Sequence, residues 1–255
     1  TPAARALEAV AHIAENQTTT TVPGGPVSAV GGFVYVRAVG EQLIEDPSRN
    51  EPAYAALVSV THETWIATDG SGRVRVQYGA LRFPTAADQT AWEADGRPVL
   101  TRNIDDTAGP GGLAEDPSQV PADPDALQAY FLERANSQYP ASAELLEQIA
   151  NFLATAPATP QQRAAAYRVA AKIPNIELVG DVTDTLGRPG IAVAATYAVD
   201  DHQEQFTLIF SPHTGDLLEA KQDILPTLSG QAGLTRFSAT FTRVENVQGL
   251  DTPDN

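Results

Sequence analysis

The chain contains four histidines, and their spacing decides which histidine chemistry is available. They are His12, His62, His202 and His213. No two of them lie three or four residues apart, so one helix face cannot present a pair of imidazoles to a metal ion. The sequence therefore predicts no metal site and no metal catalysis at these positions.

A serine and a histidine near residue 212 have the residue types of a nucleophile and its base. Ser211 precedes His213 by two residues, and a base beside a hydroxyl can activate it for hydrolysis. The segment reads as a turn, however, and lacks the Gly-x-Ser-x-Gly elbow of the α/β-hydrolases. We keep a hydrolase using Ser211 and His213 as the weakest of three functional hypotheses.

An acidic stretch between residues 105 and 125 could supply oxygen ligands to a hard cation such as calcium. It lacks the Asp-x-Asp-x-Asp-Gly pattern with a distal Glu. Some of its carboxylates lie next to a predicted helix start, where they would cap backbone amides. We therefore predict a long solvated loop over residues 105–123, with calcium binding left open. The acids are Asp105, Asp106, Glu115, Asp116, Asp123 and Asp125.

Five aromatic residues on the first predicted strands are candidates for binding an apolar ligand. They are Phe33, Tyr35, Tyr54, Trp65 and Tyr78. A curved sheet with helices on one side leaves a concave apolar space that such residues can line, and core packing is the alternative for each. No Walker loop or Gly-x-Gly-x-x-Gly fingerprint is present, so we predict no nucleotide cofactor.

Charge and composition exclude several classes of function. The 255 residues include 32 acidic and 16 basic ones, for a net charge of −16. Such a charge repels nucleic-acid phosphates, so we predict no nucleic-acid partner. With 42% hydrophobic residues and no apolar run near the ~20 residues that span a bilayer, the chain as given is a globular domain that does not cross a membrane. Cysteine is absent, which excludes disulfides and thiolate catalysis.

Methionine is also absent, and the chain begins at Thr1. We therefore expect a processed protein or a piece of a longer precursor, from which an export or anchor segment is missing.

The pattern of elements predicts strands, then helices, then strands. An amphipathic helix is predicted over residues 3–16, followed by a polar linker. Strands are predicted over 33–39, 54–68 and 73–78, with a hairpin at Asp69-Gly70-Ser71-Gly72 and a short helix over 85–95. Helices are predicted over 125–136, 143–155 and 161–172, with Asp123, Ser142 and Thr159 as caps. Five further strands are predicted over 176–182, 191–199, 206–210, 217–223 and 237–242.

Strands in two blocks with three helices between them favour an α+β fold over alternating βαβ units. We predict a mainly antiparallel, curved sheet made of two meanders, with a block of three helices between them. We expect a membrane-proximal helix and linker over residues 1–26, a single domain over 27–248, and a frayed tail over 249–255.

Several segments, in this order, resemble one family. They are Glu63-Thr64-Trp65 with Asp69-Gly70-Ser71-Gly72, the helix entry over 121–127, the helix over 163–168, and the segments over 173–174, 187–193 and 210–218. Together they resemble the actinobacterial, membrane-anchored proteins found beside extracytoplasmic-function sigma factors, a family without an assigned biochemical role. The resemblance covers roughly residues 31 to 247 of the sequence.

The resemblance implies a cytoplasmic N-terminus and one transmembrane helix, both outside this chain, with the present chain as the extracytoplasmic domain in the cell envelope. By weaker analogy it implies a half-barrel like that of bacterial lipoprotein carriers. It supplies no catalytic residues and no cofactor. The leading hypothesis is a non-catalytic binding or sensing domain for a lipid or other apolar ligand. The alternative is a module that binds an envelope protein or a sigma-factor partner through the acidic loop and the helices.

Overall fold

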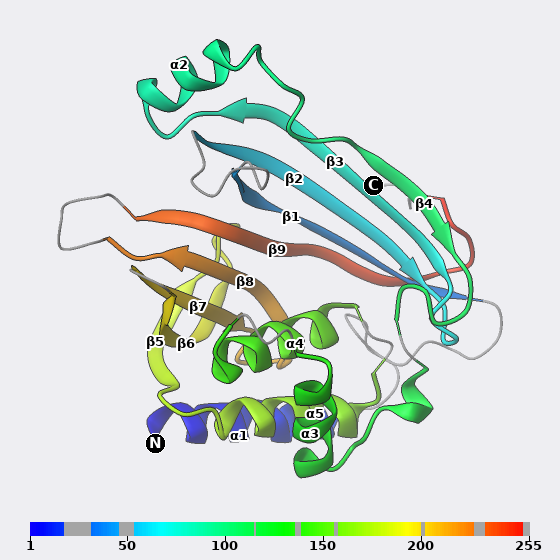
Figure 1. Cartoon of the computed structure of the whole chain (residues 1–255). Coiled ribbons are helices and arrows are strands. Elements are labelled where there is room, and N and C mark those ends of the chain that lie inside the picture. Colours follow the sequence, from blue (N-terminus) through cyan, green and yellow to red (C-terminus); the bar gives the residue numbers. More distant parts are fainter. Residues whose placement is uncertain are drawn as a thin grey trace.

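The protein is an α+β structure built on one large, open antiparallel sheet (Figure 1). The computed structural model describes residues 1–17, 32–45, 54–114, 116–135, 139–155, 158–199, 202–226 and 233–251. Within these residues, nine strands are arranged in the order β4-β3-β2-β1-β9-β8-β7-β6-β5. The strands are β1 (Phe33–Glu45), β2 (Ala55–Ile66), β3 (Gly72–Arg82), β4 (Ile104–Ala108), β5 (Glu177–Thr183), β6 (Pro189–Val199), β7 (His202–Phe210), β8 (Leu217–Ile224) and β9 (Leu234–Val247).

A single seam joins strands that are distant in the sequence. β1 to β4 lie side by side in chain order, as do β5 to β9. β1 then pairs with β9 in antiparallel orientation, with Phe33 opposite Val247. At Gly40 a Cβ would lie 1.7 Å from the carbonyl oxygen of Ser238, so only glycine permits this close approach of β1 and β9. The described strands thus form one continuous sheet.

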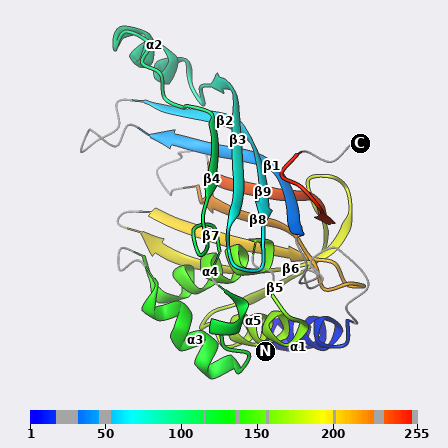
Figure 2. The same cartoon turned by 90° about the vertical axis from the view of Figure 1, so that its right-hand side faces the viewer.

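Four helices cover one face of the second half of the sheet (Figures 1 and 2). They are α1 (Pro2–Glu15), α3 (Pro124–Glu133), α4 (Ala141–Thr155) and α5 (Pro160–Ala171). α4 lies between the sheet and the other three helices. Their apolar faces and the facing residues of β6, β7 and β8 form the largest core of the described chain. The short α2 (Ala86–Ala94) lies apart, beyond the end of β3.

The helix starts follow local sequence signals at two of the three predicted caps. The Asp123 carboxylate accepts hydrogen bonds from the first amides of α3, and Thr159 forms a capping box with Gln162 at the start of α5. Both predictions are confirmed. The prediction for Ser142 is wrong, because α4 begins at Ala141 and the carbonyl of Pro140 accepts the amides of Ala143 and Glu144. A backbone carbonyl therefore accepts the first amide hydrogen bonds of α4, where we predicted the Ser142 side chain.

The segment over residues 105–123 is not one long loop. It contains the edge strand β4 and a 3-10 turn at Pro117–Gln119. The sequence of β4, Ile-Asp-Asp-Thr-Ala, has weak strand propensity, so its conformation depends on pairing with β3. Arg73 on β3 donates two hydrogen bonds to the Asp105 carboxylate, at 2.7 and 2.8 Å. This contact joins residues 32 positions apart, and local patterns do not reveal it.

Both ends of the described chain are bound to the rest of the protein. α1 buries Leu7 and Val10 in the main core, although we placed it with the linker outside the domain. At the other end, where we expected fraying, the carbonyls of Leu250 and Asp251 accept hydrogen bonds from Arg73 and Trp65. Most of the predicted linker, and residues 252–255, lie outside the described residues.

Candidate ligand-binding cavity

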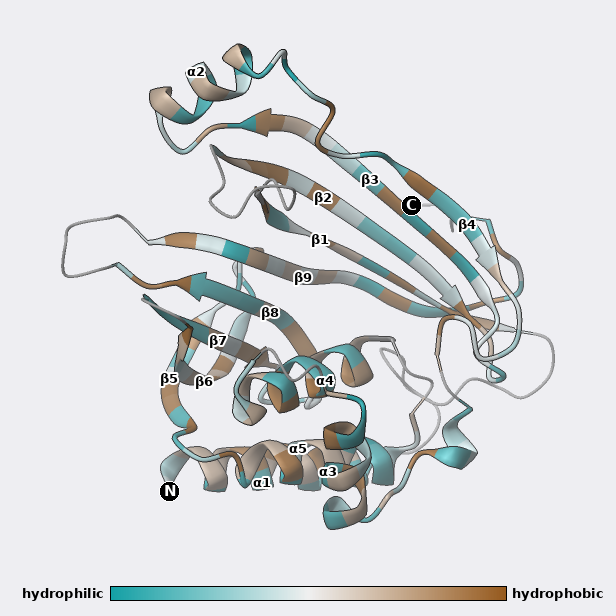
Figure 3. Ribbon diagram, in the orientation of Figure 1, coloured by the Kyte–Doolittle hydropathy of each residue, from teal (hydrophilic) through white to brown (hydrophobic). Residues whose placement is uncertain are grey.

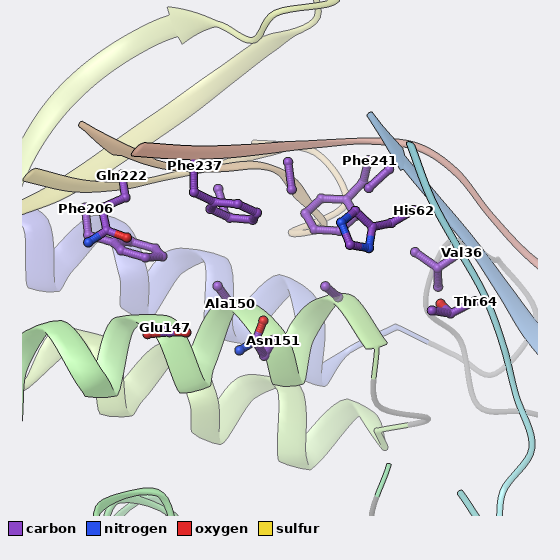
Figure 4. Close-up of a pocket in the computed structure, with 14 residues that line it drawn as sticks. Val36, His62, Thr64, Glu147, Ala150, Asn151, Phe206, Gln222, Phe237 and Phe241 are labelled. Carbon is purple, nitrogen blue, oxygen red and sulfur yellow. The ribbon is translucent and has the colours of Figure 1, made fainter. Parts of the chain in front are cut away.

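A mostly apolar cavity of about 350 Å³ lies between α4 and the sheet (Figure 4). Its size falls within the range of small-molecule sites. Helix α4 forms one wall, and strands β1, β2, β7, β8 and β9 form the other. The lining residues are Val36, Ala38, His62, Thr64, Glu147, Ala150, Asn151, Ala154, Phe206, Ala220, Gln222, Phe237, Ala239 and Phe241.

The helical wall is one stripe of α4. Glu147, Ala150, Asn151 and Ala154 follow the three-to-four residue spacing that places side chains on one helix face. Other positions, such as Leu146 and Ile149, are fully buried in the main core. The core therefore fixes α4, while its small alanines face the sheet and leave space between the two layers.

The sheet wall consists of two rows of residues that run across neighbouring strands. His62, Ala38 and Phe241 are paired across β2, β1 and β9. Phe237, Gln222 and Phe206 are paired across β9, β8 and β7. Figure 4 shows the three phenylalanine rings facing α4. Ala38, Ala220 and Ala239 lie among these rings, so the wall is apolar but does not fill the space.

Two titratable side chains, His62 and Glu147, line the cavity. Burial lowers the pKa of His62, so its imidazole is neutral at pH 7. Among the described residues its ring nitrogens have no hydrogen-bond partner. Burial, together with the nearby Glu144 carboxylate, raises the pKa of Glu147. The cavity therefore combines apolar walls with a neutral imidazole that can still donate and accept a hydrogen bond.

The five aromatic residues predicted from the sequence do not line this cavity. Tyr35 and Trp65 are fully buried and pack against each other on the opposite face of the sheet, with ring centroids 5.0 Å apart. Tyr54 is buried and donates its hydroxyl to Asp95 at 3.1 Å. Phe33, at the start of β1, and Tyr78, on β3, are half-buried. The structure thus brings only Tyr35 and Trp65 together, and a ligand-binding role for the five stays a prediction.

Sequence reasoning missed the residues that form the sheet wall, although a usable signal was present. Phe237, Ala239 and Phe241 alternate with polar residues, which predicts one apolar face for β9. The same alternation predicts that His62 and Glu63 point to opposite faces, and this is confirmed, since Glu63 accepts a hydrogen bond from Tyr35 on the face away from His62. Which of the two faces lies under a helix depends on tertiary packing.

Ser211 and His213 lie in a tight turn between β7 and β8. The Ser211 hydroxyl accepts hydrogen bonds from the amides of His213 and Thr214, at 3.4 and 3.2 Å. Within the described chain no hydrogen bond joins the Ser211 hydroxyl to the His213 ring. These contacts give Ser211 a role in shaping the turn.

The acidic residues near position 115 have local structural partners. Asp116 accepts the amide of Ser118, and the Asp125 carboxylate forms an ion pair with Lys172 at 2.6 Å. Across the described residues, no group of three or more His, Asp or Glu side chains could hold a metal ion. Glu115 lies outside these residues. Each of these contacts gives one acidic side chain a structural role that needs no metal ion.

No helix in the described part of the chain combines the length and the apolar character needed to cross a bilayer. Comparison of the sequence with protein families and with curated proteins finds no match. The cavity and its chemistry are therefore the basis on which a function can be argued.

Proposed function

We propose that this protein binds an apolar small molecule or lipid in the cavity between α4 and the sheet, without catalysing a reaction. The main support is the cavity itself, in which three phenylalanines and several alanines surround about 350 Å³ of space. Transfer of apolar surface from water into such a space is favourable, by roughly 25 cal/mol per Å². A ligand that fills the space gains this free energy without a rearrangement of the core.

The position of His62 indicates that the ligand also carries a neutral polar group. A neutral imidazole both donates and accepts, and a hydroxyl or amide can satisfy either nitrogen. Thr64 lies beside His62 in the lining and adds a hydroxyl. An amphipathic molecule with an apolar body toward Phe206 and Phe237 and a hydroxyl toward His62 matches this distribution.

The fold and the cellular setting belong to the same proposal. A curved sheet made of two meanders that encloses an apolar space beneath a helix is the arrangement of a carrier-like half-barrel. The family resemblance supports an extracytoplasmic location in the cell envelope, as part of a membrane-anchored or secreted bacterial protein. In that setting the domain carries or senses its ligand, and an envelope protein is the partner that would receive it or respond to it.

The test uses substitutions that fill the cavity from either wall. Binding of the neutral apolar probe N-phenyl-1-naphthylamine to each variant is measured by fluorescence. Ala154→Leu on α4 and Ala239→Leu on β9 each place a larger side chain in the cavity. We expect saturable binding to the unmodified protein and at least about tenfold weaker binding to each variant, which corresponds to ~1.4 kcal/mol.

The matched control is Ala141→Leu, at the exposed start of the same helix. Ala and Leu have similar helix propensity, so this variant should bind the probe as the unmodified protein does. Equal binding by all four proteins would show that the probe binds elsewhere. Absence of saturable binding to the unmodified protein would refute the proposal and favour the protein-interaction module. Native mass spectrometry of protein purified from its own cells then gives the mass of the natural ligand.

A further inference from the structure

The face of the sheet opposite the cavity carries a second, polar pocket. It measures about 520 Å³ and is formed by side chains of β1, β2, β3 and β9. Arg37, Arg75 and Arg243 line it together with Tyr35, Glu63 and Thr242. On β1 and β2 these residues alternate with the residues that face the apolar cavity. On β9 the register shifts at Thr242, so that both Thr242 and Arg243 line this second pocket. The two pockets therefore share strands but no residues.

The charge of this pocket is opposite to that of the chain. Three guanidinium groups and the Glu63 carboxylate line it, and the Glu245 carboxylate pairs with Arg243, which leaves an excess of one positive charge. The whole chain carries a net charge of −16. At physiological salt, charges beyond roughly 8 Å are largely screened, so the nearby arginines dominate the potential that a small anion experiences in this pocket.

The strand register places two of these arginines directly opposite each other. Arg37 on β1 pairs with Arg243 on β9 on one side and with Glu63 on β2 on the other. Like charges directly opposite on neighbouring strands destabilise a sheet. A sequence selected for stability alone would place an acid at one of these two positions.

The carboxylates nearby are engaged with other groups. Glu63 accepts hydrogen bonds from the Tyr35 hydroxyl at 2.7 Å and from Nε of Arg75 at 2.8 Å. Arg243 forms an ion pair with Glu245 at 2.6 Å. Arg37 donates one long hydrogen bond, of 3.3 Å, to the Thr242 hydroxyl. It forms no ion pair with a carboxylate of the described residues.

We propose that this second pocket binds a phosphate dianion, with Arg37 as its main ligand. Among the described residues Arg37 supplies a positive charge that no carboxylate offsets, and a phosphate monoester carries a charge of about −1.5 to −2 at neutral pH. The planar guanidinium of Arg37 can donate two parallel hydrogen bonds to phosphate oxygens. A bound dianion would also offset the repulsion between Arg37 and Arg243. The pocket is larger than a phosphate group, so the group belongs to a larger molecule or shares the site with water.

The test titrates inorganic phosphate into the protein by calorimetry, at constant ionic strength and at a pH where phosphate is a dianion. We expect saturable binding to the unmodified protein. Loss of charge-assisted hydrogen bonds in Arg37→Gln should weaken it about tenfold or more. Arg37→Lys keeps the charge but loses the two-pronged geometry, and its affinity should fall between the other two.

Arg82→Gln is the control, because it removes the same charge from an exposed side chain at the far end of β3. It should bind phosphate as the unmodified protein does. Thermal unfolding of each variant shows whether it is folded. No saturable binding to the unmodified protein, or equal weakening by Arg37→Gln and Arg82→Gln, would overturn the proposal.

A second titration distinguishes the two sources of a phosphate group. Soluble dihexanoyl phosphatidic acid should bind more tightly than inorganic phosphate if the site recognises a lipid headgroup, and no more tightly if it recognises free phosphate. Ala239→Leu, which fills the other cavity, should leave phosphate binding intact. These experiments therefore test phosphate binding in the second pocket independently of apolar-ligand binding in the first cavity.

Discussion

The two halves of the sheet reach stability in different ways. In the covered half, defined as β5 to β8 with α1, α3, α4 and α5, the helices and the sheet share one large apolar core. In the open half, defined as β1 to β4, the structure shows a small cluster centred on Val34 and Val36. The strands of this half also bury larger apolar side chains, among them Tyr35, Val58, Trp65 and Ile66. Figure 3 shows hydrophobic and hydrophilic residues alternating along β3.

The open half also carries a line of charged side chains that crosses its strands. Five charged residues are register partners on neighbouring strands from β9 to β4: Arg243, Arg37, Glu63, Arg75 and Asp105. Burial of apolar surface is non-directional, whereas these contacts require an exact geometry between side chains. Both candidate binding sites use β1, β2 and β9, so the open half contributes residues to each of them.

The largest expected difference between the halves concerns one ion pair in each. Arg163 and Asp216 form a buried pair in the covered half, 3.2 Å apart, and both side chains are at most 10% exposed. Asp216→Ala leaves an uncompensated buried charge and should lower the free energy of unfolding by about 4 kcal/mol. Chemical denaturation measures this change. The double variant Arg163→Met with Asp216→Ala should recover much of the loss.

The matched change in the open half is Asp105→Ala, which removes the exposed partner of Arg73. Surface pairs contribute little because water solvates both charges and salt screens them. We expect a far smaller change in unfolding free energy than for Asp216→Ala. Equal losses in the two variants would contradict the contrast between the halves.

A smaller difference is expected for leucine truncation. Leu146 on α4 is 0% exposed and lies in the main core, so Leu146→Ala should cost about 3 kcal/mol through lost burial and a residual cavity. Leu81 on β3 is half-buried, so Leu81→Ala should cost about 1 kcal/mol, in proportion to the area it buries. Thermal and urea unfolding of both variants check the ratio. An equal or larger cost at Leu81 would contradict the expected dependence on buried area.

The smallest effect is a pH dependence from Glu204 on β7, whose side chain is fully buried. Burial alone would raise its pKa, but hydrogen bonds from His202 and Gln222 and the charge of Arg236 lower the pKa below the ordinary value for Glu. A lowered folded-state pKa adds stability above the unfolded value of about 4.3, which is lost as pH falls. In the Glu204→Gln variant the free energy of unfolding should therefore fall less steeply as the pH is lowered from 5. Chemical denaturation at a series of pH values measures this change. An unchanged acid profile would mean that other carboxylates dominate it.

How much of this structure can be predicted from the sequence depends on the range of each interaction. The caps at Asp123 and Thr159 act within three residues, and both helix starts were predictable. β4 depends on its pairing with β3, in which Arg73 contacts Asp105 from 32 positions away in the sequence. The cavity was not predictable, because Phe206 and Phe241 come from different strands and the packing of α4 decides which face of the sheet is covered. Alternation alone assigns residues to two faces but does not say which face the helices cover.

The seam between β1 and β9 has a consequence for how the chain folds. It pairs Phe33 with Val247, residues near opposite ends of the chain, so its formation closes a very long loop. Loop-closure entropy must be overcome before such a contact adds stability, and high contact order slows folding. Each half contains strand pairs that are close in sequence and can form first. We therefore expect β1 and β9 to pair last. Gly40→Ala obstructs this pairing and should slow the final phase of refolding, which stopped-flow measurements detect.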